Sequence, residues 1–322
     1  MPACARTIPN TGETPALISP KPVVRLSILL VNHNGMRDLA ECLDSVKQFL
    51  PPETEVILAD NASTDGSVER VVREYPWVRV VRSTQNLGFA AGNNLAGREA
   101  TGKFVLLLNT DTILLEPIAP VIDWLDEHAG HAVLTINMLD GTHVSRACTG
   151  YFPSPSRLIL LRHMLIQPEH YGNEYAYDVD WVQGSFLLMR TEHWRALSGL
   201  DESYFMYAED VDLCQRVHAA GWQCAYLPHV RYIHLGGYNP KRFPEQAASL
   251  GIYIRRHMKG SQKLVCWTIL ATGCLARTFF YGLKVVLVSD EKSRAISRSS
   301  WLAFKALLHM DQGWRTRERS LE

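Results

Sequence analysis

An apolar run that ends in a carboxylate is the first stretch of this sequence suited to chemistry. Residues 104–108 are all apolar, as in a strand buried on both faces, and Asn109, Thr110, Asp111 and Thr112 follow directly. In open α/β sheets the ligand crevice lies beyond the carboxyl ends of the strands. A carboxylate at Asp111 is therefore an oxygen ligand suited to Mg²⁺ or Mn²⁺ carrying a diphosphate. The same residue types are common in turns, so the rest of the chain must decide between the two roles.

A second group of carboxylates lies about a hundred residues further along. Glu209, Asp210 and Asp212 cluster at the expected start of a helix, directly after the apolar residues 205–207. Acidic side chains favour helix N-termini because they interact with the helix dipole, which explains one or two of the three. It does not explain why an apolar stretch leads straight into two adjacent carboxylates. We therefore treat this group as a second candidate centre.

The elements that would position these groups alternate between strand and helix. Strands are expected at residues 25–34, 55–60, 78–82 and 103–112, with helices at residues 38–49, 68–74 and 94–101 between them. This alternation predicts an α/β fold with a mostly parallel sheet and right-handed crossovers. The early turns offer polar residues on one rim of that sheet, which suggests a crevice of nucleotide size. These residues are His33, Asn34, Asp60, Asp65, Asn86, Asn93 and Asp111.

Motifs and composition exclude several protein classes. No G-x-G-x-x-G follows the first strand and no G-x-x-x-x-G-K-[ST] occurs, which disfavours a dinucleotide dehydrogenase and a P-loop NTPase. Lys plus Arg and Asp plus Glu both number 33, so the chain has no bias towards nucleic acid. The seven cysteines form no Cys-x-x-Cys pair, which suits a reducing compartment and argues against a zinc finger. We see no signal peptide at the N-terminus.

Although the net charge of the whole chain is zero, its C-terminal part is basic and apolar. Residues 251–322 carry 13 Lys and Arg against 5 Asp and Glu. Residues 264–288 are long enough for a membrane span, but Arg277 and Lys284 interrupt them on one helical face. An amphipathic helix at a membrane surface fits better, with these basic side chains at the polar boundary. We expect residues 255–310 to contact the membrane; the alternatives are that these helices pack on the rest of the protein or form a homodimer.

Taken together, the ordered motifs resemble family 2 glycosyltransferases with the GT-A fold, especially the rhamnosyltransferase-like branch. The resemblance covers roughly residues 25–238. Each motif is weak alone, but their order and spacing are specific. They are Ser27-Ile-Leu-Leu-Val-Asn-His-Asn34, Asp60-Asn-Ala-Ser-Thr-Asp-Gly-Ser67, Asn86-Leu-Gly-Phe-Ala-Ala-Gly-Asn-Asn94, Leu108-Asn-Thr-Asp111, Trp181-Val-Gln-Gly-Ser185 and residues 199–216.

The resemblance implies a role for each of these motifs. Asp60 corresponds to the residue that binds the nucleotide base, and Asp65 braces its turn with Ser63 and Gly66. Asp111 corresponds to the last residue of the DXD motif, a metal ligand, with Asn109 at the first acidic position. The other donor-side residues are Asn32, Asn34, Asn86, Gly88 and Asn93.

The later motifs would supply the catalytic and acceptor side. By resemblance Asp210 is the catalytic base, with Glu209 the neighbour most easily confused with it, and His234 completes the metal site or contacts the diphosphate. Trp181, Gly184 and Ser185 would face the acceptor sugar. Lys241 and Arg242 would clamp phosphates as a loop closes, or are ordinary exposed charges.

These assignments imply a domain plan and a reaction. We expect a flexible arm at residues 1–22, a GT-A catalytic domain at 23–245, with a nucleotide-binding half (23–112) and an acceptor half (113–245), and a membrane-associating helical tail at 246–322. The reaction would be inverting transfer of a sugar to a hydroxyl of a lipid-linked saccharide, at the cytoplasmic face of the plasma membrane in bacterial surface polysaccharide synthesis. The first expectation for the donor is dTDP-rhamnose, with a UDP- or GDP-sugar as the alternative.

Two other classes of function remain open from the sequence. A nucleotidyltransferase also uses an α/β sheet and Mg²⁺, but it usually has a basic, Gly-rich loop after the first strand, and residues 32–35 contain no Lys or Arg. A non-catalytic membrane-bound scaffold that binds sugars or nucleotides would tolerate changes at Glu209 and Asp210.

Overall fold

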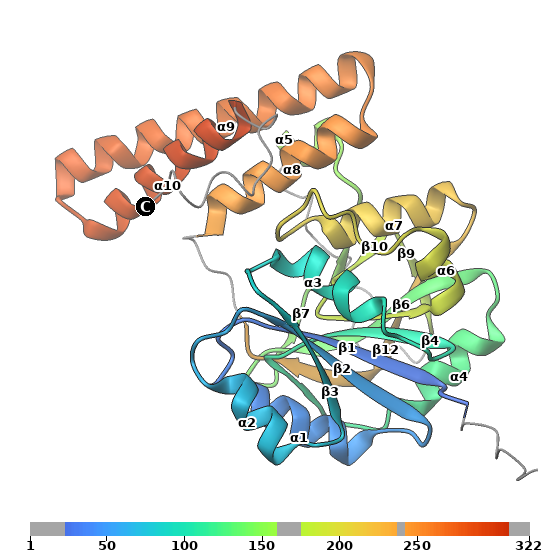
Figure 1. Ribbon diagram of the computed structural model, residues 1–322. Coiled ribbons are helices and arrows are strands. Elements are labelled where there is room, and N and C mark those ends of the chain that lie inside the picture. Colours follow the sequence, from blue (N-terminus) through green and yellow to red (C-terminus); the bar gives the residue numbers. More distant parts are fainter. Residues whose placement is uncertain (1–22, 160–174, 237–241, 309–322) are drawn as a thin grey trace, which may run out of the picture.

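The computed structural model describes residues 23–159, 175–236 and 242–308 (Figure 1). The expected N-terminal arm at residues 1–22, residues 160–174 of the expected acceptor half and Lys241 lie outside the described residues.

The first half of the molecule is the predicted parallel sheet. Strand β1 (Leu26–Asn32) pairs in parallel with β2 (Thr54–Asn61) on one side and with β4 (Phe104–Asn109) on the other. Strand β3 (Val78–Ser83) continues the parallel pairing beyond β2. Because the four strands are parallel, their polar carboxyl-terminal turns share one edge, as the sequence predicted.

The second half of the sheet mixes strand directions. The described strands follow the order β3-β2-β1-β4-β11-β6-β12-β5, and β11 (Phe186–Arg190) is antiparallel to both of its neighbours. The further strands are β5 (Thr112–Leu114), β6 (His131–Leu139), β7 (Ser145–Arg146), β9 (Tyr177–Val179) and β12 (Gln223–His234), with β8 (Thr149–Gly150) and β10 (Trp181–Val182) as a separate pair. A turn that contains residues 140–141 joins β6 to β7, which pair antiparallel.

Helices cover both faces of the sheet and bury a core on each side (Figure 1). The strands separate the two cores because successive side chains point to opposite faces: Ile28 lies in one core, whereas Leu29 lies in the other. One face carries α1 (Leu39–Phe49), α2 (Ser67–Glu74) and α4 (Ala119–Glu127); the other carries α3 (Gly88–Gly97), α6 (Thr191–Ala196) and α7 (Glu209–Ala219). The short helix α5 (Pro155–Ile159) lies near the C-terminal helices.

Three C-terminal helices form a layer beside the α/β body, which is the sheet with its covering helices (Figure 1). They are α8 (Phe243–His257), α9 (Gly260–Val288) and α10 (Glu291–Leu308). Helix α8 begins two residues before the expected domain boundary at residue 245, and its Tyr253 and Ile254 join the core that contains α7. The first helix of the tail is therefore part of the packing of the α/β body.

Helix α9 is the part of the described chain that is long and apolar enough to cross a membrane. Its most apolar window has a mean hydropathy of 1.4 and is only 17% buried. Arg277, expected at the polar boundary of this helix, has its guanidinium 4.7 Å from the ring centre of Phe243 in α8. Lys284 is exposed.

Candidate active site

The turn after β2 is held together by hydrogen bonds from β1. The Asn32 side chain is fully buried and donates to Ser63 Oγ at 2.9 Å and Ser67 Oγ at 2.8 Å. Asp65 accepts from Ser67 and from the backbone N–H of Met36, so it braces the turn through Ser67 rather than through Ser63 as expected. The predicted contact of the Asn32 side chain with a donor is therefore corrected to a role in shaping the turn.

Two polar residues of the same turn region remain near the rim. Asp60, which is 4% exposed, accepts a hydrogen bond from the backbone N–H of Ser63, which closes the turn after β2. Asn34 is exposed and has a positive φ of 55°, and its side-chain oxygen accepts from the backbone N–H of Thr64. These two residues lie at the carboxyl edge of β2 and β1, where the sequence placed them.

The turn that opens α3 packs against the segment before the second acidic group. Gly88 has a φ of +81°, and a Cβ built there would lie 2.3 Å from the carbonyl oxygen of Phe205. The backbone N–H of Phe89 donates to that same oxygen at 2.7 Å. Asn86 accepts from the N–H of Gly88 and thereby fixes the turn. Sequence reasoning missed Phe205 as the partner, because nothing in the sequence links two segments that are more than a hundred residues apart.

Gly88 and Asn93 were expected to contact the donor, and the structure corrects both. Gly88 is buried beneath Phe205. The Asn93 side chain is 1% exposed and donates within its own helix to the carbonyl of Phe89. Both residues therefore shape the edge of the crevice without facing it.

We expect Gly88→Ala to destabilise the protein by about 2–4 kcal/mol, because the new Cβ would need a strained backbone and would collide with Phe205. Gly273→Ala is the matched control: it lies inside α9 with nothing within 4 Å of the added Cβ, and we expect it to stabilise by about 0.5–1 kcal/mol. Urea unfolding of the two variants checks this. Equal effects would show that the contact with Phe205 does not constrain the fold.

Asp111 and His234 meet at the end of the central strands. His234 Nε2 lies 3.2 Å from Asp111 Oδ1, and Asn109 Nδ2 lies 3.4 Å from the same ring nitrogen. The last residues of β12 bring His234 here by pairing antiparallel with β5. Burial acts to raise the pKa of Asp111, but the hydrogen bond and charge of His234 outweigh it and the pKa is lowered. The carboxylate is therefore ionised at neutral pH.

Gly236 lets the chain pass close to this pair. A Cβ at Gly236 would lie 2.5 Å from Asp111 Oδ2 and 2.9 Å from His234 Nε2. The backbone N–H of Leu235 also donates to the carbonyl of Asp111.

These residues fit a divalent cation. A carboxylate oxygen and an imidazole nitrogen converge here, and the side-chain oxygen of Asn109 is buried without a hydrogen-bond partner among the described residues. Oxygen and imidazole ligands suit Mn²⁺ or Mg²⁺, which commonly take their remaining ligands from substrate phosphates and water. The described part of the chain holds no group of three or more His, Cys, Asp and Glu that would enclose a metal by themselves.

The two neighbouring carboxylates of the second acidic group differ in their exposure to solvent. Asp210 is partly exposed and accepts hydrogen bonds from the backbone N–H of Gly184 at 2.9 Å and of Val211 at 2.8 Å. Burial raises the pKa of Asp210, and these hydrogen bonds offset the rise only in part. Glu209 is 4% exposed, and its Oε2 has no hydrogen-bond partner among the described residues. Asp210 is therefore the more accessible of the two carboxylates.

A short chain of contacts joins the two acidic centres. Asp210 binds the N–H of Gly184, and the carbonyl of the next residue, Ser185, accepts from the N–H of Asn109 at 3.1 Å. Asn109 in turn contacts His234, the partner of Asp111. The two carboxylates, about a hundred residues apart in the chain, therefore belong to one edge of the sheet.

The remaining predicted site residues have mixed outcomes. Trp181 is 5% exposed and donates to the carbonyl of Tyr151, and the Ser185 hydroxyl lies 2.7 Å from the hydroxyl of Tyr232 inside the core. Both side chains are buried, and the predicted place of Trp181 and Ser185 on the acceptor side stays a prediction. The backbone N–H of Gly184 donates to Asp210, whereas its predicted contact with the acceptor sugar stays a prediction. Arg242 is exposed and lies 3.6 Å from Glu245.

We expect Glu209→Gln to raise the stability of the protein at neutral pH. Burial and the neighbouring Asp210 raise the pKa of Glu209 well above its ordinary value. Between the unfolded and the folded pKa the native state binds the extra proton, so stability falls as pH rises through that window. Gln is neutral at every pH, so the gain in Tm over the wild type should be present at pH 8 and vanish at about pH 4. Each kcal/mol of added stability should raise Tm by about 2–4 °C. A gain that does not depend on pH would contradict the raised pKa.

Comparison with known proteins agrees with this geometry. Residues 27–146 match the family model for glycosyl transferase family 2. The N-acetylglucosaminyl-diphospho-decaprenol L-rhamnosyltransferase of Mycobacterium tuberculosis is 26% identical over 247 residues, which cover 68% of this chain and 78% of the relative. The rhamnosyltransferase WbbL of Escherichia coli K12 is 28% identical over 186 residues, covering 54% and 68%.

Solved structures show the same fold. The mannosyltransferase PcManGT from Pyrobaculum calidifontis, in complex with GDP-Man and Mn²⁺, superposes with a TM-score of 0.54 at 16% identity and covers 93% of this chain and 91% of its own. TarS residues 1–349 from S. aureus, in complex with UDP, gives a TM-score of 0.51 at 17% identity and covers 91% of each chain.

The similarities in sequence indicate a glycosyltransferase that uses a nucleotide-sugar donor. Its α/β sheet has the GT-A-like fold of the solved structures, with two acidic centres at one edge. Residues 27–146 are similar to glycosyl transferase family 2, and the similarity to the two rhamnosyltransferases extends over a longer part of the chain.

Proposed function

We propose that this enzyme transfers a sugar from a nucleotide-diphosphate donor to a hydroxyl group with inversion at the anomeric carbon, and that Asp210 is the base. The observation that supports it most directly is the partly exposed Asp210 carboxylate, oriented by the N–H of Gly184 and linked through Ser185 and Asn109 to the Asp111–His234 pair. A single displacement needs one base and no nucleophile from the protein.

The residues of the site would have separate roles in this reaction. Asp210 takes the proton of the attacking hydroxyl, and its raised pKa makes it a better proton acceptor than an ordinary aspartate. Asp111 and His234 would hold the divalent cation beside the diphosphate. When bound, that cation would neutralise the charge that grows on the departing diphosphate. Asn109 links the two centres because its backbone binds Ser185 while its side chain lies beside His234.

For the substrates we propose L-rhamnose from dTDP-rhamnose as donor and a polyprenyl-diphosphate-linked saccharide as acceptor, in bacterial surface polysaccharide synthesis. The names of the two relatives from M. tuberculosis and E. coli support this choice. A UDP- or GDP-sugar is the alternative donor, since the structures of similar fold include complexes with UDP and with GDP-Man.

A panel of nucleotide sugars tests the donor. The purified enzyme is incubated with each donor and a polyprenyl-diphosphate-linked N-acetylglucosamine, with Mn²⁺ or with EDTA, and nucleotide diphosphate release is followed. We expect release of dTDP from dTDP-rhamnose only when the acceptor and Mn²⁺ are present. Faster release from a UDP- or GDP-sugar would identify that nucleotide sugar as the donor in place of dTDP-rhamnose. No release from any donor would refute transfer to this acceptor class.

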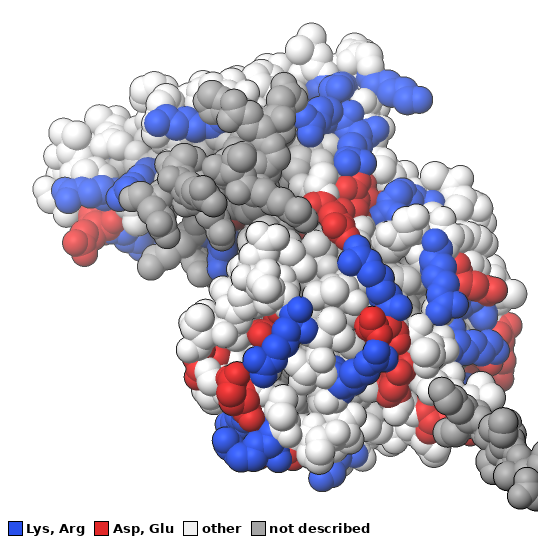
Figure 2. Space-filling model, viewed as in Figure 1, with Lys and Arg blue, Asp and Glu red and all other residues white. Residues whose placement is uncertain are grey.

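We further propose that the C-terminal helices bind the cytoplasmic face of the plasma membrane. Many of the exposed side chains of α9 are apolar, among them Phe279, Phe280, Leu283 and Leu287, each at least 60% exposed. Figure 2 shows basic side chains gathered where α8 meets α9, while the outer edge of the helical layer is largely without charge. Apolar side chains with basic residues beside them suit the surface of an anionic leaflet.

Membrane binding predicts that Leu283→Asp loses affinity for anionic vesicles by at least about tenfold, because burying one leucine contributes about 1.5–3 kcal/mol and the new charge opposes insertion. Val72→Asp is the matched control, since Val72 is 56% exposed on α2 in the α/β body. Co-sedimentation with phosphatidylglycerol vesicles measures both. Equal binding of the two variants would refute the role of α9.

A further inference from the structure

Helix α8 contacts the segment that carries the catalytic carboxylates at four positions along one face. Ser249 Oγ donates to the carbonyl of Met206 at 2.7 Å, and Tyr253 Oη donates to Gln215 Oε1 at 2.8 Å. One turn further, Arg256 pairs with Asp201 and donates to Ser203 Oγ, and His257 Nε2 lies 2.6 Å from Asp212 Oδ1. Residues 249, 253, 256 and 257 share one helix face, so α8 runs alongside the catalytic segment from residue 201 to residue 215.

The contact with Asp212 acts on the helix that carries Asp210. The two residues are two positions apart on α7, so their side chains point to nearly opposite sides of the helix. Asp210 faces Gly184, and Asp212, which is 1% exposed, faces α8. Burial acts to raise the pKa of Asp212, but hydrogen bonds from His257 and Arg216 outweigh it and the pKa is lowered. An ionised carboxylate anchored on one side of α7 fixes the rotation of α7, and with it the direction of Asp210.

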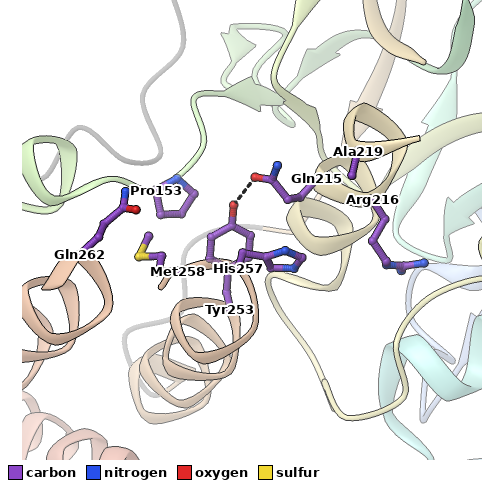
Figure 3. A pocket seen from close by; sticks show the side chains of 8 residues that line it. All are labelled: Pro153, Gln215, Arg216, Ala219, Tyr253, His257, Met258 and Gln262. Carbon is purple, nitrogen blue, oxygen red and sulfur yellow. Dashed lines mark hydrogen bonds between the residues drawn. The ribbon is translucent and has the colours of Figure 1, made fainter. Parts of the chain in front are cut away.

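The cavity beside these contacts lies behind α7, away from the catalytic edge. It measures about 210 Å³ and is lined by residues of α7 and α8, including Gln215, Arg216, Tyr253 and His257. Figure 3 shows the bond between Tyr253 and Gln215 crossing from one helix to the other, with the His257 side chain beside it. The two helices also share an apolar core, which contains Ile254 of α8 and Val211 of α7, so the hydrogen bonds add fixed directions to a contact that packing already makes.

The turn before α7 is strained, and α8 holds that turn as well. Tyr207 and Ala208 have positive φ values of 71° and 62°, although neither is glycine. Such a conformation persists only when its surroundings impose it. Ser249, which is 4% exposed, binds the carbonyl of Met206, the residue directly before this pair. Helix α8 thus contacts both the strained turn and the first turn of α7.

We propose that Ser249 and His257 are positioning residues that aim the Asp210 carboxylate, and that α8 thereby connects the C-terminal helices to the rate of sugar transfer. The opposite side of α8 packs on α9 and α10 through Ala247, which lies in one apolar cluster with Ala271, Cys274, Ala303 and Leu307. This inference rests on the proposed role of Asp210 as base.

Replacement of His257 tests the inference. His257→Leu removes the donor to Asp212, while Arg216 still pairs with that carboxylate at 2.8 Å, so the fold should be retained. We expect kcat to fall at least about tenfold with the KM for the donor within twofold, because misdirection of a catalytic group affects the chemical step. His257→Gln, whose amide nitrogen can reach the same carboxylate, should recover most of kcat.

Arg256→Gln is the matched control, because it removes the neighbouring contacts of α8 to Asp201 and Ser203, which lie further from Asp210. We expect its kcat to stay within twofold of the wild type, with a loss of Tm no larger than that of His257→Leu, because the Arg256 side chain is largely exposed. If kcat of His257→Leu equals that of the wild type, or if both variants lose kcat in proportion to their loss of Tm, the positioning role is refuted.

Ser249→Ala provides a second measurement if His257→Leu fails to fold, since it removes only one hydroxyl. We expect a fall in kcat without a change in donor KM, and an unchanged kcat would refute the role of Ser249. Turnover that survives Asp210→Asn would refute the proposed function itself, so the two failures are distinguishable.

Discussion

Asp210→Asn should lower kcat by about 10²–10⁴-fold and leave donor affinity nearly unchanged. The substitution removes the proton acceptor, whose contribution in general base catalysis has this size. Asn keeps an oxygen that can accept from the N–H of Gly184, so the local structure should be preserved. Steady-state kinetics with the lipid-linked acceptor, together with calorimetric titration of the nucleotide diphosphate, measures both quantities.

Glu209→Gln is the matched control for this variant, because it alters the adjacent carboxylate that is buried. We expect its kcat to stay within about tenfold of the wild type, a smaller loss than removal of a general base would cause. If Glu209→Gln is inactive and Asp210→Asn retains turnover, the assignment of the base is reversed.

The pH dependence of the wild type carries a separate expectation. Asp210 must be ionised to accept a proton, and burial raises its pKa above the ordinary value for aspartate. Activity should therefore fall as pH decreases through that raised pKa, at a higher pH than an exposed aspartate would give. A plot of kcat/KM against pH measures the pH at which activity falls. A value of kcat/KM that stays constant down to about pH 4, near the ordinary pKa of aspartate, would argue against Asp210 as the base.

Asp111→Ala should weaken metal-dependent binding of the donor by at least about tenfold, or about 1.4 kcal/mol. The variant removes the carboxylate that pairs with His234, and Mn²⁺ or Mg²⁺ would lose its charged ligand. Titration of the donor nucleotide in Mn²⁺ and in EDTA measures the effect, which should appear in Mn²⁺ and disappear in EDTA.

Asp123→Ala serves as control, since Asp123 is exposed on α4 and pairs with Arg25. It should bind the donor as the wild type does in both solutions. Equal affinity of the wild type in Mn²⁺ and in EDTA would contradict a metal role for Asp111.

The sequence by itself determined the parallel half of the sheet and the place of both acidic centres. Residues 104–108 are apolar throughout because β4 is buried on both faces, and a break to polar residues can only occur where the strand leaves the core. Asp111 therefore had to lie at the carboxyl edge. Local patterns of this kind can be recognised within a few residues, because they reflect the burial of one strand or one helix face.

Tertiary structure decided which of the polar residues at that edge face the crevice. Asn32, Asn93 and Ser185 have the residue types of a binding site, yet each is buried against a segment far away or within its own helix. Glu209 and Asp210 are adjacent and chemically alike, and only the packing of α7 separates the buried one from the partly exposed one.

The same limit applies to the C-terminal helices. The periodicity of the sequence placed Arg277 on the polar side of α9. It could not show that the guanidinium of Arg277 contacts the ring of Phe243 in α8. The contacts of Ser249 and His257 with the catalytic segment were also beyond the sequence, because they join residues more than forty positions apart. The burial of a strand can be recognised from residues that are neighbours in the sequence. The partner of a side chain is decided only when elements that are distant in the sequence pack together.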